Sequence, residues 1–118
     1  MTQMELERCL KSIKYYDDTT KMYKDNIRRK YPVMHPLVMQ TWIEQIKQNE
    51  EARTKAVSLL DYAANEADRK ILYMRYVEHK KPFEIADSLF YGYSTIFSKL
   101  KDALQRLAEN VKNVPPLK

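Results

Sequence analysis

Glycine is almost absent from this chain: Gly92 is the only one in 118 residues, and the five prolines are the other strong helix breakers. β-Sheets need frequent turns, and glycine and proline supply most of them. A chain with so few turn residues, of which 44% are hydrophobic and 31% charged, has little means of reversing direction often. The sequence therefore predicts an all-α fold built from long helices.

The chain begins with a long predicted helix, from about residue 2 to residue 30, and continues with a second from about residue 37. The apolar residues of the first are spaced three or four apart and form one stripe: Leu6, Cys9, Leu10, Ile13, Tyr16, Tyr23 and Ile27. The second presents Val38, Met39, Trp42, Ile43 and Ile46. Prolines in the segment 31–36 separate the two helices, because proline lacks an amide donor. The polar stretch 47–55 is either an exposed helical bridge or a short joint.

Shorter helices are predicted in the rest of the chain. Asn65 is placed to cap one of them, and Asp68 falls in its first turn, where a carboxylate interacts favourably with the helix dipole. Pro82 occupies the preferred first-turn position of the next helix. A last helix is expected to start at Gly92 and to run to Asn110.

The segment 83–100 fits a helix-turn-helix unit. Such a unit needs a small residue in its first helix, an apolar residue at that helix's end, a sharp turn and a buried apolar residue early in the second helix. These positions are filled by Ala86, Leu89, Tyr91 and Ile96. Gly92 is tolerated as an N-cap and lets another surface approach the backbone. Because helix N-terminal amides and hydroxyl groups suit phosphates and base edges, DNA is expected to bind here.

The order of the C-terminal helices resembles region 4 of bacterial sigma factors and, more closely, the small phage and prophage late-transcription regulators of the ArpU and RinA type. The matching motifs lie in about residues 55–109: the "ILYMRY" helix, "EIA" with leucine three residues later, "Y-x-x-S-T-I-F" and "AL-x-x-L". The resemblance implies a sequence-specific binder of double-stranded DNA that activates or tunes transcription.

Two residues depart from this family pattern. Phe90 stands where the family usually has glycine, in a turn that often takes a left-handed conformation, and Lys99 stands where it tends to have an apolar residue. A bulky side chain is costly in the left-handed region. We therefore expect a remodelled turn in which Gly92 supplies the flexibility.

Eight residues are the candidate DNA contacts: Lys80, Lys81, Tyr93, Ser94, Thr95, Phe97, Ser98 and Lys101. The assumed register turns Ile96, Leu100, Ala103, Leu104 and Leu107 toward the core. Phe97 then points outward, where it can meet thymine methyl groups, and Lys101 can meet a phosphate. Alternatively, Tyr93 and Phe97 cap the core or form a dimer contact, and Lys80 and Lys81 are plain solvated lysines. Arg69, Lys70 and Arg75 are weaker candidates for phosphate contacts.

The formal net charge is +5, and the positive charge lies at the two ends of the chain. Residues 1–30 and 79–118 each carry three more basic than acidic residues, whereas residues 31–66 carry two more acidic than basic ones. This distribution suits an anionic partner. A solvated helical surface of mixed charge is the alternative interpretation.

Enzyme, metal and membrane functions find no support in the sequence. The single cysteine, Cys9, excludes an internal disulfide and fits a reducing cytoplasm. His35 and His79 have no Cys or His at ligand spacing, and one glycine cannot build a phosphate-binding loop. The acid pairs 17–18 and 50–51 are interpreted as charged helix surface. No stretch reads as a membrane span or signal peptide, so we expect a cytoplasmic protein without catalysis, metal or cofactor.

The predictions divide the chain into three parts. Residues 1–52 form a helical oligomerisation or interaction region, residues 53–112 the helix-turn-helix DNA-binding domain, and residues 113–118 a frayed tail. The long apolar stripe needs a covering surface, which favours a homodimer or a larger homo-oligomer. Two other functions stay open: a module that binds RNA polymerase or a sigma factor, and a small terminase subunit.

Overall fold

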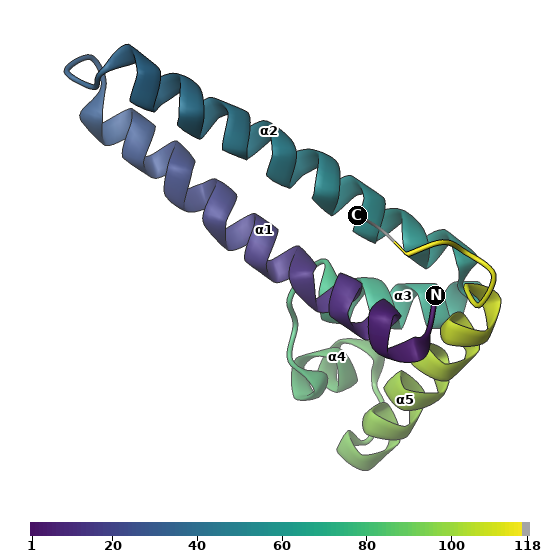
Figure 1. The fold of residues 1–118 in the computed structure, drawn as a ribbon. Coiled ribbons are helices and arrows are strands. Elements are labelled where there is room, and N and C mark those ends of the chain that lie inside the picture. The colour runs from purple at the N-terminus through teal and green to yellow at the C-terminus, as the bar shows by residue number, and fades with distance from the viewer. Residues whose placement is uncertain (117–118) are drawn as a thin grey trace.

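The computed structural model describes residues 1–116, and these residues form helices joined by short loops (Figure 1). The elements are α1 (Gln3–Lys30), α2 (Pro36–Ser58), the 3-10 helix η1 (Leu59–Tyr62), α3 (Glu66–Tyr76), α4 (Pro82–Leu89) and α5 (Tyr93–Asn110). No strand occurs in this range, which confirms the all-α prediction. The long helices come first and the shorter ones follow, as expected.

The helices begin where the sequence places capping residues. At the start of α1, the Thr2 hydroxyl accepts from the Glu5 amide (3.1 Å) and the Glu5 carboxylate accepts from the Thr2 amide (3.0 Å), a capping box that lowers the pKa of Glu5. Asn65 caps α3, as predicted, by accepting from the Asp68 amide at 2.8 Å. Pro82 is the first residue of α4, also as predicted.

Helices α1 and α2 form an antiparallel hairpin that projects from the rest of the molecule (Figure 1). The polar stretch 47–55 continues α2. Of the two alternatives for this stretch, the helical bridge is therefore confirmed and the short joint is wrong. We call residues 14–55 the arm, because none of its side chains is buried. Its apolar stripe is only half-covered, and large apolar side chains such as Val33 (90% exposed) and Leu37 face outward.

The main core lies where the arm joins the shorter helices. Leu6, Leu10 and Ile13 of α1 are fully buried there. Their buried partners come from α2, η1, α3, α5 and the residues just after them: Ala56, Leu59, Leu60, Leu72, Val77, Ala103, Leu107 and Val111. The packing therefore runs across the predicted boundary at residue 52, and the start of α1 belongs to the same core as α5.

The chain after α5 is packed for several residues. Val111 is fully buried, and Val114 lies against the same core. The backbone nitrogen of Met1 donates to the carbonyl oxygens of Val114 (2.7 Å) and Lys112 (3.0 Å), which holds the two ends of the described chain together. The predicted frayed tail is thus wrong for Val114, which these contacts hold against the core; residues 117–118 lie outside the described range.

An ion pair between a buried aspartate and an exposed arginine joins α3 to α5. Asp68, only 5% exposed, accepts two hydrogen bonds from the Arg106 guanidinium, at 2.6 Å from Nε and 2.9 Å from an Nη atom. The bonds to Asp68 raise the pKa of Arg106. A two-point contact of this kind fixes both the distance and the rotation of the two side chains. It therefore sets the position of α5 relative to α3.

Candidate nucleic-acid interface

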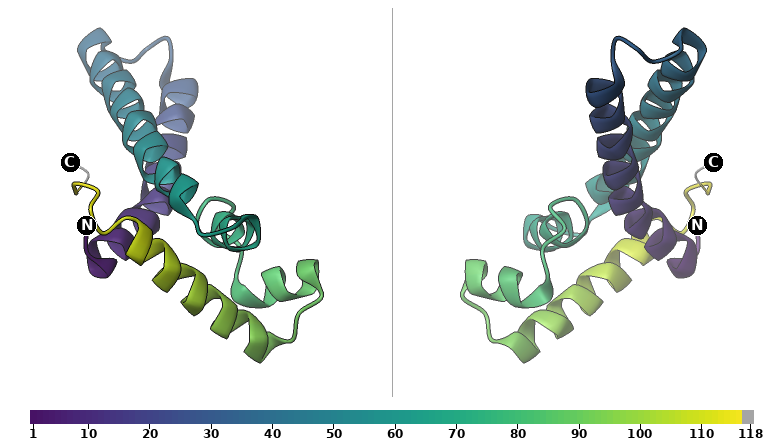
Figure 2. Two further views of the ribbon diagram at one scale, coloured as in Figure 1. Left: turned by 90° about the vertical axis from the view of Figure 1, so that its right-hand side faces the viewer. Right: turned by 90° about the vertical axis from the view of Figure 1, so that its left-hand side faces the viewer.

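Helices α4 and α5 meet at a short turn, at the end of the molecule remote from the tip of the arm (Figure 2). They pack on α3 around a second, smaller core of Ile71, Met74, Ile85, Ala86 and Ile96. The sequence assigned Ala86 and Ile96 to buried positions, and both side chains are fully buried. Leu89 and Tyr91 are partly buried against the same cluster. The inner side of the predicted helix-turn-helix unit is therefore packed as expected.

Contrary to the expectation from the sequence, the turn between α4 and α5 is not remodelled around Gly92. Phe90 has φ 60° and ψ 38°, and the amide of the next residue, Tyr91, donates to the carbonyl of Ala86 at 2.9 Å. Gly92 has φ −68° and ψ 153°, an extended conformation that any residue adopts. The expectation that Gly92 replaces a strained Phe90 is wrong, because Phe90 itself ends α4 as a left-handed cap.

Gly92 is the N-cap of α5, as predicted. Neither its backbone nor its surroundings demand a glycine, since an added Cβ would meet only the Thr95 hydroxyl at an ordinary 3.7 Å. Its lack of a side chain leaves the first turn of α5 uncovered. A surface that approaches this turn thus meets backbone and hydroxyl groups directly.

The predicted contact residues of α5 all lie on one exposed side of the molecule's last helix. We call this set the outer face of α5: Tyr93, Ser94, Thr95, Phe97, Ser98 and Lys101, each of them exposed. The Tyr93 hydroxyl donates to the Asp87 carboxylate of α4 at 3.3 Å, so its ring bridges the two helices. Neither Tyr93 nor Phe97 caps a core, which removes one of the alternatives considered for them.

Lys99 departs from the family pattern without disturbing the core. Its ammonium group lies 4.7 Å from the centre of the Tyr91 ring, a cation–π distance. The Lys99 side chain is half-buried, and its charge faces the partly buried Tyr91. The lysine is thus accommodated by a contact within the α4–α5 unit.

The two lysines before α4 differ in their surroundings. Lys80 is half-buried and pairs with Glu78 at 3.4 Å. Lys81 is exposed, and its backbone amide donates to the Glu84 carboxylate at 3.0 Å, which fixes the start of α4. Lys81 is therefore the better placed of the two to reach a phosphate.

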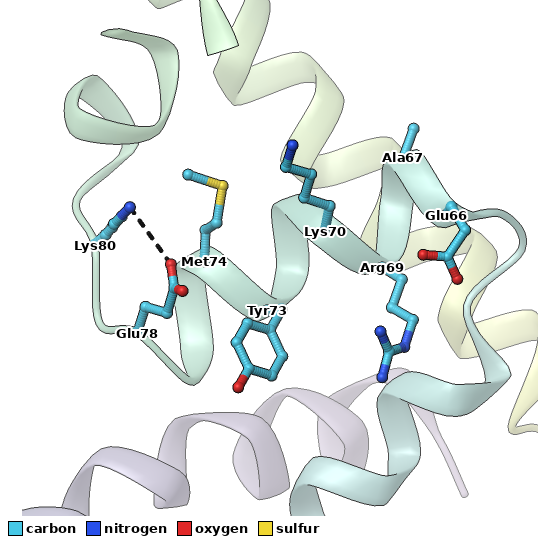
Figure 3. Close-up of a pocket in the computed structure, with 8 residues that line it drawn as sticks. All are labelled: Glu66, Ala67, Arg69, Lys70, Tyr73, Met74, Glu78 and Lys80. Carbon is cyan, nitrogen blue, oxygen red and sulfur yellow. Dashed lines mark ion pairs between the residues drawn. The ribbon is translucent and has the colours of Figure 1, made fainter. Parts of the chain in front are cut away.

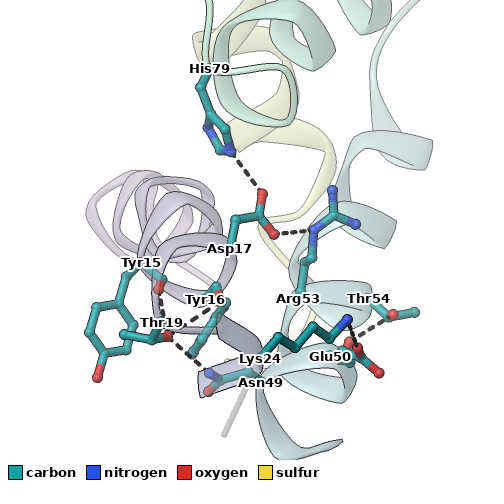
Figure 4. Close-up of polar contacts among 10 residues, drawn as sticks. All are labelled: Tyr15, Tyr16, Asp17, Thr19, Lys24, Asn49, Glu50, Arg53, Thr54 and His79. Carbon is teal, nitrogen blue, oxygen red and sulfur yellow. Dashed lines mark hydrogen bonds and ion pairs between the residues drawn. The ribbon is translucent and has the colours of Figure 1, made fainter. Parts of the chain in front are cut away.

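The loop between α3 and α4 is tied to both helices of the arm through Asp17. Figure 4 shows the His79 ring and the Arg53 guanidinium pointing at the two oxygens of this carboxylate, at 2.7 Å and 2.6 Å. Asp17 was predicted to be helix surface. Its partners lie 36 and 62 residues away in the sequence, so no local pattern could have indicated them.

Arg75, a weaker candidate for a phosphate contact, also supports this loop. Its guanidinium donates to the backbone carbonyl of Lys80 at 3.2 Å, and its side chain is half-buried. The loop residue His79 adopts φ 58°, a left-handed conformation that the contacts of Arg75 and Asp17 maintain. Arg75 therefore positions Lys80 and Lys81 instead of facing solvent.

Arg69 and Lys70, the other weak candidates, line a shallow hollow on α3 and the following loop (Figure 3). Arg69 pairs with Asp61 at 3.6 Å, and the hollow also contains Glu66 and the Glu78–Lys80 pair. Its charges are thus mixed, and it shares only Lys80 with the eight predicted contact residues. The structure does not bring Arg69 and Lys70 onto the outer face of α5.

Within residues 1–116, no group of three or more His, Cys, Asp or Glu side chains is arranged to hold a metal ion. The helices described for this chain include none that is long and apolar enough to cross a membrane. The chain matches no protein-family model, and comparisons with curated proteins and with solved structures likewise find no match. The resemblance to sigma region 4 and to the ArpU and RinA regulators stays a prediction.

Proposed function

We propose that this protein is a sequence-specific DNA-binding transcription regulator of the phage or prophage type. The observation that carries the proposal is the α4–α5 unit, whose inner side is fully buried at Ala86 and Ile96 and whose outer face is exposed. Units of this kind place the second helix in the major groove while the first crosses the backbone. In this proposal, α5 is the recognition helix.

The chemistry of the unit supports a DNA ligand. Lys81, at the start of α4, and Lys101, two turns into α5 at the end of the outer face, are both exposed. Lysines at these places contact phosphates on either side of a groove, and the hydroxyls of Ser94 and Ser98 between them suit base edges or phosphates. The formal net charge of +5 acts in the same direction.

We further propose that the arm joins two or more copies of the protein. None of the residues of the arm is buried, and Val33, Leu37 and Ile43 expose large apolar side chains there. A dimer would present two recognition helices, as helix-turn-helix regulators do when they bind two half-sites. The protein would act in the cytoplasm of a bacterial host, without catalysis and without a cofactor.

The test is selection of bound sequences from a random pool of duplex DNA, followed by titration of the winning duplex at several salt concentrations. The proposal predicts an enriched motif and binding that weakens steeply with salt. Capture of RNA polymerase or a sigma factor without any enriched motif would replace it with the interaction-module function. A ring-sized assembly in light scattering would favour a small terminase subunit.

A further inference from the structure

Phe90 combines a strained backbone with an exposed side chain. Its backbone is left-handed, at φ 60° and ψ 38°, and its side chain is 94% exposed. Glycine or asparagine is the usual occupant of such a cap, since a side chain with a bulky Cβ substituent is strained there. The exposed ring offsets none of this strain within the described chain, which makes Phe90 a candidate for a contact with another molecule.

Phe90 begins a series of exposed aromatic residues. Tyr93 and Phe97 follow at spacings of three and four residues, and their side chains are 57% and 61% exposed. Residues four apart on a helix lie on the same side, so Tyr93 and Phe97 are neighbours along α5. We call Phe90, Tyr93 and Phe97 the aromatic strip. Tyr93 is held in place by its hydrogen bond to Asp87.

The first six residues of α5, around Tyr93 and Phe97, lack the side chains that read guanine and adenine. Guanine is recognised chiefly by arginine or lysine, and adenine by asparagine or glutamine. The first six residues of α5, Tyr93 to Ser98, contain none of these. They offer aromatic rings and hydroxyl groups, and apolar groups in the major groove contact the 5-methyl group of thymine.

We infer that the aromatic strip contacts thymine methyl groups in the major groove, so that this protein prefers sites that contain thymine; this inference rests on the proposed function. The first turns of α5 favour DNA over a second copy of the chain as the occupant of the strip. Residues 93–98 include no acidic side chain, and their exposed hydroxyls lie at a helix N-terminus, whose free amides and dipole attract phosphate. The exposed carboxylates of the two helices, among them Glu84, Asp87 and Asp102, lie outside this segment.

The experiment compares the selected duplex with the same duplex in which deoxyuridine replaces thymidine. Only the 5-methyl groups differ between the two. The parent protein should bind the uridine duplex less tightly by about fourfold for each methyl group that it contacts. Phe97→Ser should distinguish the two duplexes less than the parent does, because one of the three aromatic contacts is lost. Tyr15→Ser, which removes another exposed aromatic residue but on α1, should keep the parent's preference.

Phe90→Gly separates function from stability, because it should change them in opposite directions. Glycine relieves the left-handed strain, so the melting temperature should rise, while the affinity for the thymine duplex should fall severalfold. A Phe90→Gly variant that binds as tightly as the parent would remove Phe90 from the contact.

Equal binding of the thymine and uridine duplexes by the parent would overturn the inference and leave the proposed function intact. Absence of any duplex binding would overturn both. If Phe97→Ser reduced the molar mass in light scattering and kept the parent's preference for thymine, the strip would be a contact between copies, and the inference would again be wrong.

Discussion

Replacing Leu10 of α1 with alanine should destabilise α5, although the whole arm lies between Leu10 and α5 in the sequence. Leu10 is fully buried in the core that also contains Ala103 and Leu107. The substitution removes three carbon atoms, worth about 0.8 kcal/mol each as transferred groups, and leaves a cavity. Together these terms lower the free energy of unfolding by about 3–5 kcal/mol.

Hydrogen exchange followed residue by residue is the assay. Because 1.36 kcal/mol corresponds to a factor of ten, amides of α5 that exchange through global unfolding should exchange about a hundred to a few thousand times faster in Leu10→Ala. The matched control is Ile27→Ala, which shortens a half-buried apolar side chain in the arm. It should alter the fluorescence of the single tryptophan, Trp42, and leave protection of α5 unchanged.

The outcome that refutes this reasoning is specific. If the α5 amides of Leu10→Ala kept the parent's protection while those of α1 lost it, the two helices would not share one cooperative core. Residues 53–112 would then fold as an independent unit, as the division from the sequence proposed.

Three further predictions concern other parts of the molecule. Ile96→Ala empties a fully buried position and should lower the free energy of unfolding by roughly 2–5 kcal/mol in thermal melts; an unchanged melt would contradict the packing of the α4–α5 unit. Burial raises the pKa of the Cys9 thiol, so less thiolate forms near neutral pH and reaction with a disulfide reagent should be slower than in urea; equal rates would disagree. A Val33→Lys, Leu37→Lys double variant should have a lower molar mass than the parent in light scattering, whereas a monomeric parent at micromolar concentration would disprove association through the arm.

The helices were predictable because each depends on signals close together in the sequence. The cap at Asn65, the proline that opens α4 and the apolar spacing that buries Ile96 all act within one or two turns. The length of α2 was left undecided at the stretch 47–55, where the side chains are polar all round. Nothing local ends a helix there, and α2 continues to Ser58.

The contacts between distant segments could not be predicted. Asp17 and Asp68 both looked like ordinary charges on helices, yet one binds His79 and Arg53 and the other is buried against Arg106. Their roles depend on where the helices cross, which no pattern within a helix specifies.

For the candidate interface, the exposed residues of α5 were predicted correctly and the turn before it was not. The register of α5 placed the outer-face residues in solvent, where the structure has them. The sequence led us to expect a remodelled turn in which Gly92 supplies the flexibility, because a bulky residue is strained in the left-handed region. The structure assigns that conformation to Phe90 and leaves Gly92 with an ordinary backbone.

The most direct test of the central claim is the salt dependence of duplex binding by Lys101→Ala, compared with Lys47→Ala. Both variants remove one exposed lysine, but Lys47 lies on the arm. The proposed recognition by α5 predicts that Lys101→Ala lowers the slope of log affinity against log salt by about 0.9, as one fewer counterion is released, and that Lys47→Ala keeps the parent's slope. Equal slopes for the parent and both variants would contradict the placement of α5 on DNA.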